Sequence, residues 1–188
     1  MTSRLSRAAA LAAGPLLTVA LLVPSASADV WVIHDATGDG SGGTSGGEGK
    51  WGDIGTVRVG HGARYVWLTI RPAPGGGPAD FYDVWVDTKR TDPGPEFVVS
   101  VSAEVSKWTS VRRAGRWGRL GGARVCEVPT LQGPGYDGLV RLAVPRRCLR
   151  TDGAIPKRIR VAVRTTMEYT LADWAPGVRS FGRWVTAG

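Results

Sequence analysis

Apolar and polar residues alternate along many short stretches of this chain, with a period of two. In residues 64–71 the aliphatic positions are Val66, Leu68 and Ile70, and the residues between them are aromatic or polar. The same alternation runs through residues 81–88, 96–105 and 156–166. A period of two is typical of strands with one buried face, so each of these segments is predicted to be a strand with one aliphatic side.

Similar runs recur between turn-forming residues, whereas the longer period of amphipathic helices is nearly absent. The chain of 188 residues contains 27 Gly and 12 Pro, which bound these runs. The pattern predicts an all-β fold: an antiparallel two-sheet β-sandwich of the jelly-roll or immunoglobulin-like kind, with about ten strands. The predicted segments are 30–35, 53–60, 64–71, 81–88, 96–105, 108–113, 116–120, 123–128, 137–145, 156–166 and 179–186.

The first 28 residues have a different composition. Arg4 and Arg7 precede an apolar run over residues 8–23, and small residues follow it up to Ala28. This order is typical of a secretory signal peptide, so we expect cleavage near Ala28 and an exported single domain over 29–188. The alternative is a membrane anchor, which needs roughly 20 apolar residues and therefore a longer run than residues 8–23. We expect no transmembrane segment in the mature chain.

The mature chain contains two cysteines, Cys126 and Cys148. In an oxidising compartment an isolated pair predicts one disulfide. The alternative is two free buried thiols.

Two sets of motifs resemble known families. The stretches "GDI…VRVGHGARYVWLTIR" and "VWVDT…GPEFVVSV" are loosely similar to carbohydrate-binding β-sandwiches of the CBM9-like and DOMON-like kind. The stretches "RVCEV", "YDGLVRLAVPRRCL" and "PKRIRVAVRT" resemble a group of secreted actinobacterial proteins of unassigned function. Together the resemblances cover most of residues 35–165, and they imply a secreted sandwich with a Cys126–Cys148 bridge.

A glycine-rich loop over residues 35–53 carries three acidic residues, Asp35, Asp39 and Asp53. Carboxylate and carbonyl oxygens on such a loop suit Ca²⁺, although the spacing is not that of an EF-hand. These three residues are therefore candidate ligands for a structural Ca²⁺, and no other cofactor is expected. The alternative is that the aspartates only cap strand ends and form turns.

Aromatic side chains alternate with the aliphatic ones in segments 64–71 and 81–88, which we expect to be neighbours. Exposed rings flanked by carboxylates suit sugar recognition, and large exposed apolar patches usually mark binding surfaces. The residues of this predicted sugar-binding platform are Tyr65, Trp67, Phe81, Asp83, Trp85 and Asp87. The alternatives are a protein interface, or a second small core if a loop such as residues 170–176 covers the rings.

The net charge is +8 and the sequence pI is about 10.2. Such a charge favours attraction to polyanions, including acidic polysaccharides and anionic cell-wall polymers such as teichoic acids. The arginines expected to point outward from strands are Arg58, Arg141, Arg158, Arg160 and Arg164. Nucleic acid is not expected as a partner, because the chain is exported and has no nucleic-acid-binding motif. The alternative is a solvated surface without a ligand.

No catalytic motif is present. His34 and His61 are the two histidines, and His61 lies in the sequence "GHGA", which predicts an exposed turn. Asp83 and Asp87 on one strand would lie about 13 Å apart, too far for a glycosidase pair. We therefore expect a secreted, non-catalytic binding module for carbohydrate or cell-envelope polymer. The alternatives are a structural or protein-interaction domain and a small secreted hydrolase.

Overall fold

A computed structural model describes residues 28–40, 51–92, 94–102, 108–117, 122–133, 135, 137–168 and 170–188. The predicted signal peptide thus lies outside the described residues, apart from Ala28. The strands are β1 (Asp29–His34), β2 (Ile54–His61), β3 (Tyr65–Pro72), β4 (Phe81–Asp87), β5 (Phe97–Ser102), β6 (Trp108–Arg113), β7 (Arg124–Gln132), β8 (Val140–Pro145), β9 (Arg158–Met167), β10 (Thr170–Ala175) and β11 (Val185–Thr186). A short 3₁₀ turn, η1 (Arg146–Leu149), follows β8.

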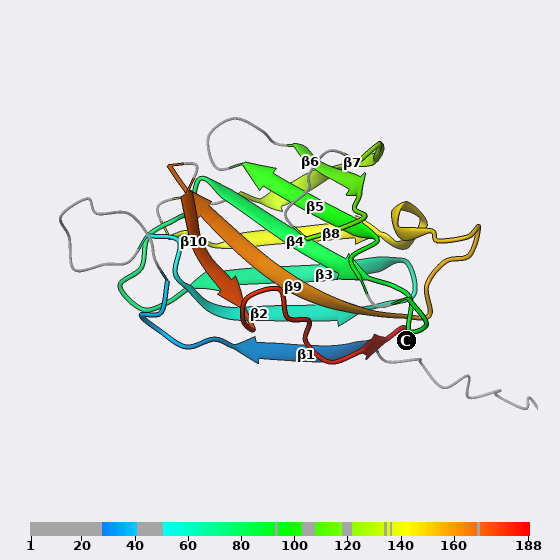
Figure 1. Ribbon diagram of the computed structural model, residues 1–188, viewed down its shortest axis with the longest axis horizontal. Coiled ribbons are helices and arrows are strands. Elements are labelled where there is room, and N and C mark those ends of the chain that lie inside the picture. Colours follow the sequence, from blue (N-terminus) through cyan, green and yellow to red (C-terminus); the bar gives the residue numbers. More distant parts are fainter. Residues whose placement is uncertain are drawn as a thin grey trace, which may run out of the picture.

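The strands form two antiparallel sheets that pack face to face (Figure 1). The first sheet has the order β1-β2-β3-β8 and ends on the last residues of β7. The second sheet has the order β7-β6-β5-β4-β9-β10, and β11 pairs with the beginning of β9. Strand β7 bends from one sheet into the other, because Arg124–Pro129 pair with β6 and Thr130–Gln132 pair with β8. The expected all-β, antiparallel two-sheet architecture is confirmed.

The main core lies between the inner faces of the sheets. Val66, Leu68 and Ile70 of β3 pack there together with Val84 and Val86 of β4, all nearly fully buried. These are the aliphatic positions of the alternating pattern, and removing their surface from water is the main favourable contribution to folding.

Two cross-connections join the sheets at opposite seams. The predicted disulfide is present between Cys126 of β7 and Cys148 of η1, and it closes a loop of 22 residues. A loop of that length contributes about 3 kcal/mol in the chain-entropy estimate. At the other seam the C-terminal residues reach back to the first sheet, where Gly188 N–H donates to the His61 carbonyl (3.0 Å). The C-terminus accordingly lies beside β1 in Figure 1.

Three segments differ from the sequence-based prediction. Residues 170–175 form strand β10, although the sequence suggested a loop there. Residues 116–117 are a turn rather than part of a strand, and 118–120 fall outside the described residues. Only Val185–Thr186 of the predicted strand 179–186 are extended and paired, because Ser180 and Gly182 instead bond to single carbonyls of the preceding turn and of β9.

Candidate functional site

The predicted sugar-binding platform is divided between the two sheets. Strand β3 pairs with β2 and β8, whereas β4 pairs with β5 and β9, so the two strands are not neighbours. The expectation that they pair is wrong because residues 73–80, rich in Pro and Gly, cross from one sheet to the other instead of forming a hairpin. Tyr65 and Trp67 therefore face outward from the first sheet, and the β4 residues face outward from the second.

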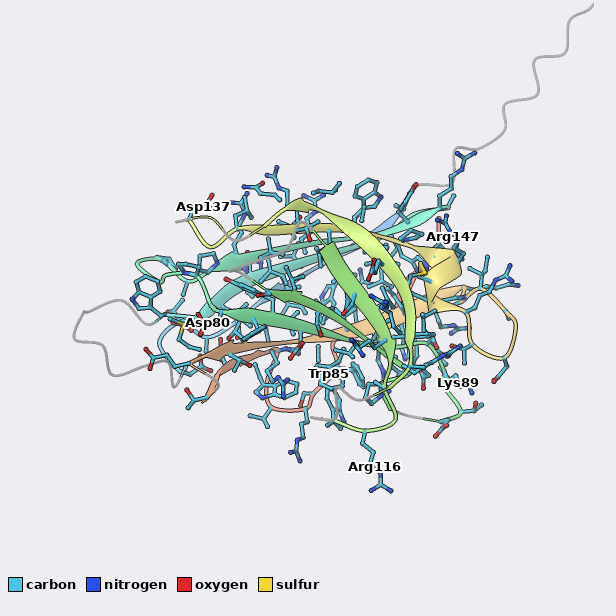
Figure 2. All side chains as sticks on the ribbon, turned by 90° about the horizontal axis from the view of Figure 1, so that it is seen from above. Asp80, Trp85, Lys89, Arg116, Asp137 and Arg147 are labelled. Atoms are coloured by element: carbon cyan, nitrogen blue, oxygen red, sulfur yellow. A yellow bond between two sulfur atoms is a disulfide. The ribbon has the colours of Figure 1, made fainter. Side chains whose placement is uncertain are left out.

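The outer side of the second sheet is a small covered core. Trp85 is 0 % exposed, and it packs with Val98 of β5 and Ala162 of β9. Trp117, from the segment after β6, covers these residues; its ring centroid lies 5.8 Å from that of Trp85. The same ring lies 5.5 Å from Trp174 and 4.6 Å from Phe181. We call Trp85, Trp117, Trp174 and Phe181 the outer aromatic cluster. Figure 2 shows Trp85 and the Arg116 turn on the same side of the molecule.

Asp83 and Asp87 are not available to sugar hydroxyls, contrary to the prediction. Both are buried and paired with arginines of the adjacent strand β9. Arg164 forms an ion pair with Asp83, and Arg160 Nε donates to Asp87 Oδ2 (2.7 Å). The remaining oxygens accept from Ser100 Oγ (2.6 Å) and from Lys89 N–H (2.9 Å). The oxygens of both carboxylates are thus occupied by groups of the same sheet and of the residues that follow β4.

The two arginines also contact the aromatic rings. The Arg160 guanidinium lies 4.9 Å from the Phe181 ring and 4.8 Å from the Trp184 ring. Arg164 lies 5.6 Å from the Trp85 ring. Cation–π contacts of this kind stabilise the layer. Arg160 and Arg164 are therefore structural residues and do not form the exposed basic surface that the sequence predicted; Arg158 remains exposed.

The outer face of the first sheet is open. Trp67 is 48 % exposed and Tyr65 is 38 % exposed, with ring centroids 5.6 Å apart. Trp67 lies between Gly60 of β2 and Ala143 of β8 in the strand register. Neither neighbour has a large side chain, and about half of the Trp67 surface is accessible to solvent. The exposed rings thus form one end of the face.

A basic hollow adjoins the rings along the strands. It has a volume of about 310 Å³ and is lined by Val32, Thr56, Arg58, Thr69, Arg71 and Arg141. Arg58 and Arg141 flank Thr69 on the neighbouring strands, and Arg71 is opposite Thr56. Two strand spacings separate Arg58 from Arg141 along the hydrogen-bonding direction, about 10 Å. Of these residues, the sequence prediction had singled out only Arg58 and Arg141.

None of the three arginines of the basic hollow has an ion pair or a side-chain hydrogen bond to any residue that the structure describes. The outward positions of β1, β2, β3 and β8 after Asp29 contain no Asp or Glu. This face therefore carries uncompensated positive charge.

The predicted calcium ligands are brought together in part. Oxygen atoms of Asp35, Asp39 and Asp173 all lie within 4.8 Å of one another. Asp53 belongs to the same region, because its Oδ2 accepts from Gly38 N–H (2.8 Å). We call Asp35, Asp39, Asp53 and Asp173 the acidic cluster. Asp173 was not predicted from the sequence, because it lies on the unpredicted strand β10 and no motif around it indicates a ligand.

The acidic cluster has an unusual electrostatic environment. Burial, together with the charges of Asp173 and Asp39, raises the pKa of Asp35 to about 7. Burial also raises the pKa of Asp173, although backbone N–H groups of Ile54 and Trp174 donate to its two oxygens and act in the opposite direction. The raised pKa values reflect carboxylates held close together without an ion-pair partner among the described residues.

His61 is fully buried, and the expectation that it lies in an exposed turn is wrong. It is the last residue of β2, and the C-terminal segment covers it. Its Nδ1 lies 3.1 Å from the Val185 carbonyl oxygen. Burial lowers the pKa of His61, which favours the neutral ring. The residue thus joins β2 to the C-terminal segment.

Comparisons of the chain with protein-family models, with curated proteins and with solved structures gave no match. The resemblances noted from the sequence therefore stay predictions.

No helix within the described ranges is both long and apolar enough to cross a membrane.

Proposed function

We propose that this protein is an exported, non-catalytic binding module for acidic carbohydrate polymers, and that the outer face of the first sheet is its binding surface. The observation that carries this proposal is the combination of three arginines without acidic partners and an exposed Trp67 on the same face. The proposal retains the polymer ligand expected from the sequence and moves the ligand-binding surface to one sheet.

The arginines suit a ligand with carboxylate, sulfate or phosphate groups. A guanidinium presents a planar fork of N–H donors that matches these anions, and it stays charged at all physiological pH values. Arg160 and Arg164, which have a structural role, are each paired with a buried aspartate. Arg58, Arg71 and Arg141 lack such partners, so an external anion would satisfy charges that the fold leaves free.

The rings suit the sugar part of the same ligand. Trp67 and Thr69 are successive outward residues of β3, so the row of rings and the first row of arginines are about 7 Å apart. In a polymer lying along the strands, one sugar ring would stack on the Trp67 indole, and the acidic groups of the neighbouring sugars would lie in the basic hollow. Strands fix the backbone of these residues, so binding has to order only their side chains.

Affinity electrophoresis and calorimetry with an acidic polymer, polygalacturonate, and a neutral one, dextran, test the proposal. We expect the mature protein to bind polygalacturonate and not dextran. Trp67→Ala is expected to weaken that binding roughly thirtyfold, since truncating an aromatic hot-spot residue commonly costs about 2 kcal/mol or more.

Trp51→Ala is the matched control. Trp51 is 41 % exposed but precedes β2 and lies outside the proposed surface. We expect this variant to bind like the wild type. Equal losses in both variants, or no retention of the wild type by any acidic polymer, would contradict the proposal and favour a structural or protein-interaction domain.

A further inference from the structure

The acidic cluster lies at the seam where β1 and β2 of the first sheet meet β10 of the second. Asp35 follows β1, Asp39 belongs to the β1–β2 connection and Asp53 precedes β2, whereas Asp173 comes from β10 of the second sheet. Asp173 Oδ2 accepts from Ile54 N–H (2.8 Å), so it already contacts the first sheet. Carboxylates of Asp35, Asp39 and Asp173 therefore come together from both sheets, and Asp53 bonds to the same loop.

Two carboxylate oxygens of the cluster are buried without a partner. Asp53 is only 4 % exposed, and its Oδ1 has no hydrogen-bond partner. Asp35 Oδ2 is buried and unpartnered as well. A buried polar atom without a partner destabilises the fold, and more so when it is charged. The oxygens of Asp53 and Asp35 could therefore accept a positively charged ligand.

Two other buried aspartates differ from the acidic cluster in having ion-pair partners. Asp83 and Asp87 each have an arginine partner. Asp35, Asp39, Asp53 and Asp173 have no Lys or Arg partner among the ion pairs of the described residues. A cation from solution would compensate this charge in the way that the arginines compensate Asp83 and Asp87.

We propose that the acidic cluster binds one Ca²⁺ ion, which connects β1 and β2 of the first sheet to β10 of the second. All candidate ligands are oxygen atoms, which disfavours zinc because zinc sites are built mainly from His nitrogen and Cys sulfur. Several carboxylates on an irregular loop suit the six to eight oxygens and variable geometry of Ca²⁺ better than the strict octahedron of Mg²⁺. The ion would fasten one seam of the sandwich, and the Cys126–Cys148 bridge fastens the other.

Thermal unfolding of the mature protein in EDTA and in Ca²⁺ tests the site. At a Ca²⁺ concentration about 100 times Kd, we expect Tm to rise by about 5–10 °C. Terbium should bind in place of calcium and give luminescence sensitised by tryptophan, because Trp174 is adjacent to Asp173 in the chain. An unchanged Tm together with no terbium luminescence would overturn the proposal. An equal Tm rise with Mg²⁺ at the same concentration would overturn the choice of calcium.

Asp39→Asn separates metal binding from folding. Asp39 is exposed, so its replacement should not disturb packing. We expect Ca²⁺ affinity to fall about tenfold or more through loss of ligand charge. In EDTA the same variant should have an equal or higher Tm than the wild type, because a repulsive charge is removed.

Asp92→Asn is the matched control, since Asp92 is an exposed aspartate in the β4–β5 connection. It should retain the calcium response of the wild type. If Asp39→Asn and Asp92→Asn respond to Ca²⁺ alike, the assignment to this cluster is wrong.

Discussion

Replacing Trp85 with alanine is expected to lower the free energy of unfolding by about 3–5 kcal/mol. Trp85 is 0 % exposed and is the residue of β4 on which Trp117 packs. Truncation removes this buried ring and leaves a cavity beneath Trp117, and it also removes the ring that faces Arg164. Denaturant unfolding followed by far-UV circular dichroism measures the change.

Trp67→Ala is the control for this prediction, because it removes the same side chain from the open face. Its unfolding free energy should stay within about 0.5 kcal/mol of the wild type, as for most exposed substitutions. The two variants should thus lose different properties: Trp85→Ala loses stability, whereas Trp67→Ala loses polymer binding. A Trp85→Ala variant of normal stability would show that the second sheet is not covered as described.

The second large effect is expected from replacing Arg58, Arg71 and Arg141 together with glutamine. Hydrogen bonds to charged groups contribute about 1.5–3 kcal/mol each, so loss of all three should weaken binding to polygalacturonate at least about a hundredfold. The remaining binding should depend less on salt, since exposed charges are screened by ions. Because these side chains have no ion pair or hydrogen bond within the described structure, the stability of the triple variant should change little.

A charge-matched control separates a specific surface from net charge. Arg116, Arg158 and Arg179 are exposed and lie on the second sheet or on segments that cover it. Their triple replacement with glutamine removes the same charge and should leave affinity within a few-fold of the wild type. If both triple variants lose affinity equally, attraction to the polymer is non-specific and the basic hollow is not the site.

The alternation of side chains allowed the fold and the two sides of each strand to be predicted. Val66, Leu68 and Ile70 are buried and Trp67 is exposed, as a period of two requires. The pair Cys126–Cys148 was predicted from composition and compartment. Strand faces depend on the local sequence, and two cysteines can form only one disulfide, so both features can be predicted without knowing how distant strands pair.

Pairing between distant strands could not be predicted in the same way. Alternation identifies the two sides of a strand but not its neighbours, which is why β3 and β4 were wrongly placed together. Alternation also does not show whether a side chain on the outer face of a sheet is exposed to solvent. Trp85 is on the outer face of the second sheet, but Trp117 from a distant segment covers it. Asp173 was missed for the related reason that β10 is a short strand without regular aliphatic alternation.

The most direct measurement is a titration of the mature, ¹⁵N-labelled protein with an acidic oligosaccharide, a galacturonate oligomer, followed by the indole N–H signals in NMR spectra. The chain has eight tryptophans, and each reports on one position of the fold. We predict a saturable shift of the Trp67 signal, with the signals of Trp85, Trp117 and Trp174 unchanged. No shift of Trp67 at saturating ligand, or a shift centred on the outer aromatic cluster, would contradict a binding surface on the first sheet.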